Sequence, residues 1–374
     1  MRSRLIRIAA AMAMFELAVF VVGYLVYWIA YRPGDRDFGV QYAAAWVGVN
    51  VGWSHIYDMR FLQPVEAAIH LDGFGVFEHP PPVALLAVPV VVLPFQWAAL
   101  VWQALLLVAL VAAALLMSPP KRWDRALILL SVAAFQPVLF ALGYATMSPL
   151  IFLLLVGTLL ALEAGKPVVA GVLLGLTALK PQLTLLVVPV LLAAGYWKTA
   201  LTAVGVVVVL AAGSVAMIGV SGTRDYLSFV TAPETLNHQM PWTVKGVVGA
   251  GVPSFVATAV VVIALAAVGY RLRPPPDVAL AVGILASLFV AQHLNYGDFV
   301  LWLLPVWLAF RPGRPMWLRA VAAVTWMTGW FMVAIPIVSV AGEVALAIAF
   351  LVAATQTRAV AEGRQLASSA VSPR

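Results

Sequence analysis

Long apolar runs separated by short polar breaks follow one another along most of the chain. The first run, residues 8–31, is long enough to cross a bilayer, because a helical crossing needs about 20 apolar residues. Further crossings are predicted at residues 97–117, 126–142, 148–162, 168–179, 183–194, 199–219, 253–270, 278–292, 299–310, 316–336 and 340–357. The pattern predicts an all-α polytopic membrane protein with a bundle of about 12 transmembrane helices. We expect a single integral membrane domain over residues 1–374.

Two longer polar segments, residues 32–96 and 221–252, interrupt this pattern as predicted outer loops. Within the first loop, the apolar run 83–93 ends at Pro94. At about 1.5 Å per residue, this run is too short to cross about 30 Å of hydrocarbon, which predicts a re-entrant or interfacial segment. Residues 40–50 and 63–71 are predicted to form short helices along the interface, where Trp and Tyr are favoured.

Composition supports the membrane class. Hydrophobic residues make up 64% of the chain and charged residues only 10%, whereas a soluble domain carries about 25% charged residues. The N-terminal run is too long for a signal peptide and lacks a small-residue cleavage site, which predicts an uncleaved first helix. The chain has no Cys, which excludes thiol catalysis and thiolate metal sites.

Charged residues divide unevenly between the two predicted sides. With the N-terminus in the cytoplasm, most of the 22 Lys and Arg residues fall on the cytoplasmic side, as the positive-inside rule requires, and the C-terminal tail returns there. The net charge of +7 therefore reflects membrane anchoring, and no nucleic-acid partner is expected. All 5 His residues and most acidic residues fall on the outer side, which places the predicted function on the outer face.

Lys180 and Pro181 break an apolar stretch that runs from residue 168 to residue 194. The flanking pieces are short, so the break is expected below the outer headgroups, where an ammonium without a partner is costly. Lys180 either extends to the interface or pairs with an anionic headgroup, most naturally a phosphate. Pro181 favours the second alternative, because it frees backbone groups that only a cavity or a ligand can satisfy.

Three further polar segments are candidates for a site. Asp35 and Asp37 follow the first crossing and are either interfacial charges or reactive carboxylates. The turn at residues 143–149 contains Gly, Ser and Pro, and Ser148 is placed to cap the next helix. The segment 292–298, with the sequence Gln-His-Leu-Asn-Tyr-Gly-Asp, is either a cap and turn or a site in which His293 orients a substrate or acts as a base.

Several site types are excluded by their missing motifs. The chain has no Walker loop, no GxGxxG after a strand, no HExxH and no GxSxG. No two His or acidic residues stand at ligand spacing on one predicted helix, so a metal site is not expected.

The order of the polar motifs resembles a known family. An Asp-Phe-x-x-x-Tyr motif at 37–42 is followed by Ile-Tyr-Asp at 56–58, His-Pro-Pro-Pro at 79–82, a Gly-x-x-x-x-Ser turn, Lys-Pro-Gln at 180–182 and a late His-x-Asn-Tyr. This order resembles glycosyltransferase family 87, the polyprenol-phosphate-mannose-dependent mannosyltransferases of GT-C fold, over about residues 1–310. The resemblance implies transfer of a sugar, most simply mannose, from a polyprenyl phosphate carrier to an acceptor hydroxyl, with inversion at the anomeric carbon.

The resemblance also implies roles for individual residues. Asp37 takes the position of the family's catalytic Asp, His293 that of the cavity His, and Lys180 that of the phosphate-binding Lys. The further substrate-binding candidates are Tyr42, His79, Gln182, Arg224, Asn295 and Tyr296. The turn that often reads Gly-Gln-x-Asn in the family is Gly-Tyr-Ala-Thr at 143–146 here, which leaves the donor sugar open. The expected partners are a polyprenyl-phosphate sugar, a glycan or glycolipid acceptor and membrane lipids, with no cofactor, in a bacterial-type plasma membrane.

The chemistry fits this inventory. A phosphate leaves as a stable anion and needs charge stabilisation, which Lys180 and Arg224 can supply. The acceptor hydroxyl needs a base, which one carboxylate provides. The alternative is a secondary transporter or lipid flippase, since broken helices and a Lys at membrane depth also occur there. The sequence shows no evident repeat between its halves, which disfavours the transporter. A third possibility, a structural scaffold without a site, is disfavoured because the His and acidic residues cluster on one side.

Overall fold

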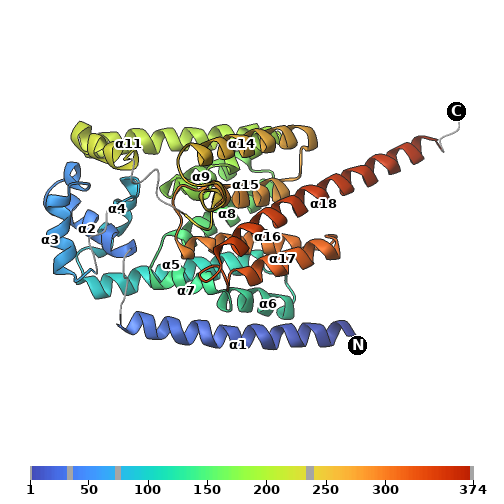
Figure 1. Cartoon of the computed structure of the whole chain (residues 1–374), viewed down its shortest axis with the longest axis horizontal. Helices are drawn as coiled ribbons and strands as arrows, with labels where there is room; N and C mark the ends of the chain where they lie inside the picture. The colour runs from blue at the N-terminus through green and yellow to red at the C-terminus, as the bar shows by residue number, and fades with distance from the viewer. Residues whose placement is uncertain (1, 32–36, 72–76, 233–239, 371–374) are drawn as a thin grey trace.

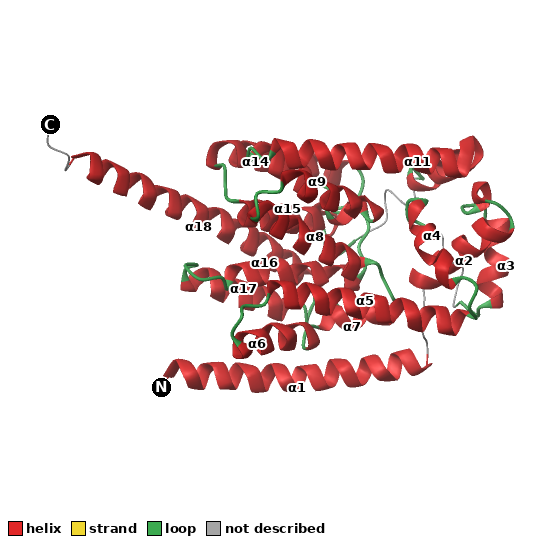
Figure 2. Cartoon of the chain, turned by 180° about the vertical axis from the view of Figure 1, so that it is seen from behind, coloured by secondary structure: helices red, strands yellow, loops and turns green. Residues whose placement is uncertain are grey.

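The computed structural model describes residues 2–31, 37–71, 77–232 and 240–370, and in these residues every regular element is a helix. The start of α1 (Arg2–Tyr31) and the end of α18 (Pro336–Ala370) lie at the same end of a helical bundle (Figure 1). The opposite end carries α2 (Asp37–Asn50), α3 (Met59–Ala68) and α4 (Pro82–Ala87), and we call it the loop end. The same arrangement is visible from behind (Figure 2).

Five described helices contain a segment long and apolar enough to cross a membrane. These segments are Ala11–Tyr31 in α1, Phe95–Met117 (α5), Trp197–Val230 (α11), Val252–Leu272 (α14) and Pro336–Gln356 in α18. A sixth is obtained if α6 (Arg122–Ala133) and α7 (Gln136–Gly143) are taken as one crossing bent by 60°. The chain is therefore a polytopic helical membrane protein.

The predicted count of 12 crossings is not supported. The remaining apolar runs form helices of 10–17 residues or shorter pieces, too short for one straight crossing of about 30 Å at about 1.5 Å per residue. They are α8 (Ser148–Glu163), α9 with η3 (Pro167–Leu176, Thr177–Leu179), α10 (Val187–Ala193), α15 (Pro276–Val290), η5 with α16 (Tyr296–Trp302, Leu303–Ala309) and α17 (Met316–Thr328). Many of them pack inside the bundle: nearly every residue of α15 is buried, so apolar sequence there reflects contact with other helices as much as with lipid.

The break at Lys180 is confirmed. Lys180 leaves the helical region, with φ −137° and ψ 73°, because a residue before Pro is disfavoured in the α conformation. A short 3₁₀ turn, η4 (Pro181–Leu183), then leads to α10. The break holds Lys180 inside the bundle, where it is 1% exposed.

Two expectations for the loops need correction. The segment 221–252 does not begin as a loop, because α11 continues to Val230 through a kink at Gly219 and α13 (Val244–Val248) follows. The helix predicted at 40–50 does form as α2, but most of it is buried beneath α3 and α4 rather than lying along the interface. The segment 83–93 is non-spanning as expected, because it divides into α4 and the 3₁₀ turn η2 (Val88–Val90).

Small residues bring α9 and α11 into close contact. A Cβ added at Gly175 would lie 2.5 Å from Val206 Cβ, and one at Gly171 would lie 2.5 Å from Thr202 Cβ. Glycine spaced by four residues lets two helix backbones approach closely, a packing mode common within membranes. This contact holds α9, the helix that leads into the break at Lys180, against α11.

Candidate active site

Asp37 begins α2 at the loop end, and its carboxylate is held by Asn295. The Asn295 Nδ2 donates to both carboxylate oxygens, at 3.0 and 2.8 Å. Asn295 is also the N-cap of η5, and forms a reciprocal capping box with Asp298. The Asn295 side chain therefore accepts from the η5 backbone through its oxygen and orients Asp37 through its nitrogen, which explains why an amide fits this position.

Lys180 and Asp298 form a fully buried ion pair. The Lys180 Nζ lies 2.5 Å from Asp298 Oδ1, and the two side chains are 1% and 0% exposed. The second oxygen, Oδ2, accepts from the Asn295 backbone N–H at 2.8 Å. Asn295 thus connects the ion pair to Asp37.

Two hydroxyls complete the environment of this ion pair. Ser148 Oγ donates to Asp298 Oδ1 and lies 3.4 Å from the Lys180 Nζ. Thr146 Oγ1 is 2.7 Å from Ser148 Oγ and also accepts from the Ser148 backbone N–H. The turn 143–149, one of the candidate segments in the sequence, therefore supplies polar groups to the base of the site.

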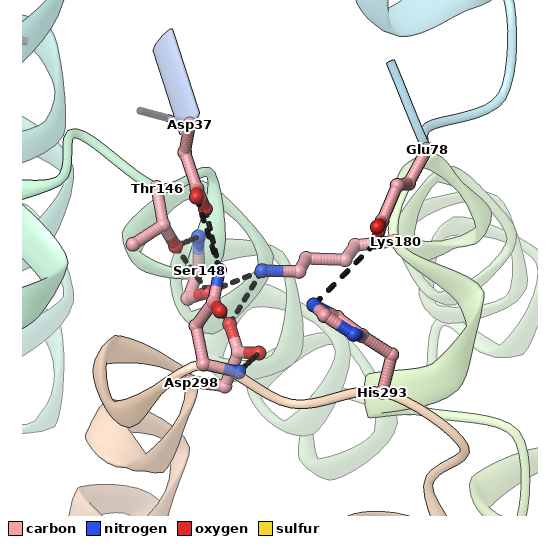
Figure 3. A network of polar contacts seen from close by, with 8 residues as sticks. Asp37, Glu78, Thr146, Ser148, Lys180, His293 and Asp298 are labelled. Carbon is pink, nitrogen blue, oxygen red and sulfur yellow. Dashed lines mark hydrogen bonds and ion pairs between the residues drawn. The ribbon is translucent and has the colours of Figure 1, made fainter. Parts of the chain in front are cut away.

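His293 and Glu78 lie on the more open side of the same cluster. The His293 Nε2 is 3.5 Å from Glu78 Oε2, and the side chains are 39% and 42% exposed. Figure 3 shows Asp37 and Glu78 entering from one side and Asp298 and His293 from the other, with Lys180 between them. We call Lys180, Asp298 and Ser148 the inner layer, because they are buried, and Asp37, Glu78 and His293 the outer layer, because they retain access to solvent.

Burial shifts the ionisation of two loop-end residues. It raises the pKa of Asp37 above its ordinary value, an effect that the nearby Lys180 charge opposes. Burial, together with Lys180, lowers the pKa of His79 to about 3. His79 is therefore neutral at pH 7, and Asp37 is a better proton acceptor than an exposed carboxylate.

The structure does not bring every predicted residue into this cluster. Tyr42 points away: its ring packs on Phe38 and Phe95, and its hydroxyl donates to the Leu93 carbonyl at 2.9 Å. Arg224 is exposed on α11. Among the described residues, neither Arg224 nor the half-buried Gln182 has a hydrogen bond to the cluster.

Tyr296 and His79 border the cluster without joining its hydrogen bonds. Tyr296 packs against Trp242 and Phe140, with ring centroids 4.7 and 5.1 Å away. The His79 carbonyl accepts from the Tyr57 hydroxyl at 2.7 Å. Asp35 lies outside the described residues.

Sequence reasoning missed several members of the site. Asp298 falls in the segment 292–298, which the sequence leaves as either a cap and turn or a site, and Ser148 is expected only as a cap, while no motif singles out Glu78 or Lys245. A signal for Asp298 existed, because a buried Lys180 requires a carboxylate and Asp298 is three residues after Asn295 in a capping-box spacing. Lys245 is fully buried, and its Nζ donates to the carbonyl of Gln292, beside His293, at 3.1 Å.

Among the described residues, no group of three or more His, Asp or Glu side chains gathers as a metal ion would require. The site carboxylates instead accept from an amide, a hydroxyl and an ammonium group.

Comparison with known proteins gives the family. The family model of glycosyltransferase family 87 matches residues 77–292, more than half of the chain. The chain belongs to glycosyltransferase family 87. The family indicates a membrane glycosyltransferase rather than the alternative transporter or flippase, and implies donor and acceptor substrates. No curated protein and no solved structure matches the chain.

The match to family 87 covers only part of the site. Glu78, Ser148 and Lys180 lie within it, whereas Asp37 and the segment from His293 to Asp298 lie outside. The structure connects these parts through the Lys180–Asp298 ion pair and the Asn295 hydrogen bonds to Asp37.

Proposed function

We propose that this family 87 glycosyltransferase moves a sugar, most simply mannose, from a polyprenyl phosphate carrier to an acceptor hydroxyl. The bundle is proposed to be of GT-C type, with the loop end on the outer face of a bacterial-type plasma membrane. One observation carries the proposal: a half-buried carboxylate, Asp37, is oriented by Asn295 and lies near the buried ammonium of Lys180. A base and a nearby cation are what transfer from a phosphate carrier requires.

The proposed reaction is a single displacement. The acceptor oxygen attacks the anomeric carbon from the face opposite the phosphate, and Asp37 takes the hydroxyl proton. The bond between the anomeric carbon and the phosphate oxygen breaks, and its electron pair leaves with the polyprenyl phosphate. Attack from the opposite face inverts the anomeric centre, and the phosphate needs no proton to leave.

Lys180 is the proposed cation for the carrier phosphate. An ammonium has three N–H donors, and Asp298 and Ser148 take two of them. Its charge also acts through the protein interior, where Coulomb interactions are stronger than in water. His293 is half exposed beside Glu78, which places it where it can contact donor or acceptor directly.

The test is transfer by the purified protein. Polyprenyl-phosphate mannose, glucose and arabinose are each incubated with glycan and glycolipid acceptors, products are followed by mass spectrometry, and NMR gives the anomeric configuration. Asp37→Asn keeps the side-chain shape and is expected to lower the rate by about 10²–10⁴-fold, the typical contribution of a general base. Asp35→Asn is the matched control and is expected to retain most activity. Robust turnover by Asp37→Asn, or retention of configuration, would contradict the mechanism.

A further inference from the structure

A pocket opens at the loop end, away from the Asp37 cluster. It lies between the start of α3 and the outer part of α11 and has a volume of about 410 Å³. A pocket of this size falls in the range that holds small ligands. Its main lining residues are Tyr57, Asp58 and Arg60 on one side and Asp225, Ser228 and Phe229 on the other.

The polar part of this pocket is preorganised. Asp58 caps α3 by accepting from the Arg60 backbone N–H at 3.0 Å. The Arg60 guanidinium also binds both Asp58 oxygens, with Nε to Oδ1 at 3.0 Å and the terminal nitrogen to Oδ2 at 2.6 Å. These hydrogen bonds lower the pKa of Asp58, which keeps the carboxylate ionised. Bidentate pairs of this kind hold their geometry.

The charge of the lining disfavours an anionic ligand. Two carboxylates, Asp58 and Asp225, line the pocket against a single guanidinium, Arg60. A phosphate would meet a net negative lining, whereas hydroxyl groups can both donate to the carboxylates and accept from the guanidinium.

The apolar part of the pocket is aromatic. Tyr57 and Phe229 line it, and Tyr57 is held by Tyr226 and Phe77, with ring centroids 5.0 and 5.5 Å away. Aromatic rings beside paired acidic and basic side chains match a sugar ring, which has apolar C–H faces and a rim of hydroxyls.

Tyr57 also connects this pocket to the candidate active site. Its hydroxyl donates to the carbonyl of His79 at 2.7 Å, and burial raises the pKa of Tyr57, so the hydroxyl keeps its proton. The His79 side chain in turn lies within the electrostatic influence of Lys180, Asp298 and His293. A ligand in the pocket therefore contacts a residue bonded to the wall of the active site.

We propose that this pocket is an acceptor subsite, which binds a neutral glycosyl unit of the acceptor other than the unit that carries the reacting hydroxyl. The proposal rests on the proposed transferase function and adds the chemical class of the acceptor, a neutral glycan or glycolipid headgroup that extends beyond one sugar.

The binding experiment compares two Trp substitutions on adjacent positions of α11. Ser228 lines the pocket and is exposed, so Ser228→Trp fills the pocket without entering the core. Leu227 is 51% exposed and does not line the pocket, so Leu227→Trp is the matched control. Mannotriose, maltotriose, arabinotriose and mannose 6-phosphate are titrated into each purified protein by calorimetry. Thermal unfolding checks that both variants are folded, and Asp225→Asn provides a second, shape-preserving variant.

We expect at least one neutral trisaccharide to bind the wild type, Ser228→Trp to weaken that binding at least 10-fold, and Leu227→Trp to leave it within 2-fold. In the transfer assay, Ser228→Trp is expected to raise the acceptor KM more than the donor KM. Equal binding by the two Trp variants, no trisaccharide binding, or tighter binding of mannose 6-phosphate would overturn the subsite. Binding without transfer by the wild type overturns the proposed function and the acceptor role with it. Transfer without trisaccharide binding at this pocket overturns the subsite alone.

Discussion

The Lys180–Asp298 ion pair allows a quantitative test of the inner layer. Asp298→Asn keeps the size of the side chain and one carbonyl oxygen for the Asn295 N–H, but it removes the negative charge from a Lys180 that is 1% exposed. Removing one partner of a buried ion pair costs about 3–5 kcal/mol, because the other charge is left without compensation. We therefore expect Asp298→Asn to be clearly less stable than the wild type.

The expected shift in melting temperature follows from the chain length. Unfolding entropy is about 2.1 cal/mol/K per residue, which for 374 residues gives about 0.8 kcal/mol/K. A loss of about 3–5 kcal/mol then lowers Tm by about 4–6 °C. This shift is well within the range of a fluorescence melting experiment in detergent.

The control is a double-mutant cycle. Lys180→Met removes the ammonium, and Lys180→Met/Asp298→Asn removes both charges, which is often nearly neutral for a buried ion pair. We expect the double variant to recover at least half of the Tm lost by Asp298→Asn. Additive losses in the double variant, or an unchanged Tm in Asp298→Asn, would show that the two side chains do not form the buried pair.

Two further predictions concern the hydrogen bond to Asp37 and the packing of α9. Asn295→Ser keeps an oxygen to cap η5 but is too short to reach Asp37, so the pKa of Asp37, already raised by burial, should rise further because the amide hydrogen bond lowers it. Since the proposed base must be ionised, the acid limb of the pH profile of kcat should move to higher pH in Asn295→Ser. An unmoved limb would show that Asn295 does not act on Asp37 as the proposed base. Gly175→Ala places a Cβ 2.5 Å from Val206 Cβ and should cost about 1–3 kcal/mol. Gly205→Ala, where nothing lies within 4 Å of the added Cβ, is the control for thermal unfolding, and equal Tm values for the two variants would contradict the α9–α11 contact.

The sequence predicted the local features of this protein well. The Lys-Pro break at 180–181, the first crossing and the non-spanning segment 83–93 all follow from residue type and run length, and the structure agrees with them. The order of short motifs along the chain also identified the family. Each of these features depends on residues that are close together in sequence or on their order.

The contacts within the site could not be read in the same way. Lys180 and Asp298 are 118 positions apart, and Asp37 and Asn295 are 258 positions apart. Their pairing depends on how η5 packs beside α7 and α8, which no local pattern specifies. The predicted count of 12 crossings is not supported for a related reason, because an apolar run has the same appearance whether it contacts lipid or other helices.

Tyr42 shows how a motif can mislead about geometry. It is five residues after Asp37 in the same helix, which rotates its side chain by about 140° from that of Asp37 at about 100° per residue. The two side chains therefore point to different neighbours, and the Tyr42 hydroxyl reaches the Leu93 carbonyl instead of the site. Tyr42 supports the position of α2, and thereby that of Asp37, by anchoring the helix to the segment after η2.

The division of the site into two layers limits what each cation can do. Asp298 neutralises Lys180 in the inner layer, so the proposed contact between Lys180 and a carrier phosphate leaves room for a second cation. Lys245 lies beside this region: its Nζ donates to the Gln292 carbonyl, next to His293, and burial lowers its pKa. A phosphate near His293 would favour the charged form of Lys245, because an opposite charge stabilises it. In the proposed reaction, positive charge for the leaving phosphate can therefore increase as the donor binds, while the ion pair of Lys180 and Asp298 keeps Asp37 and Asn295 in place.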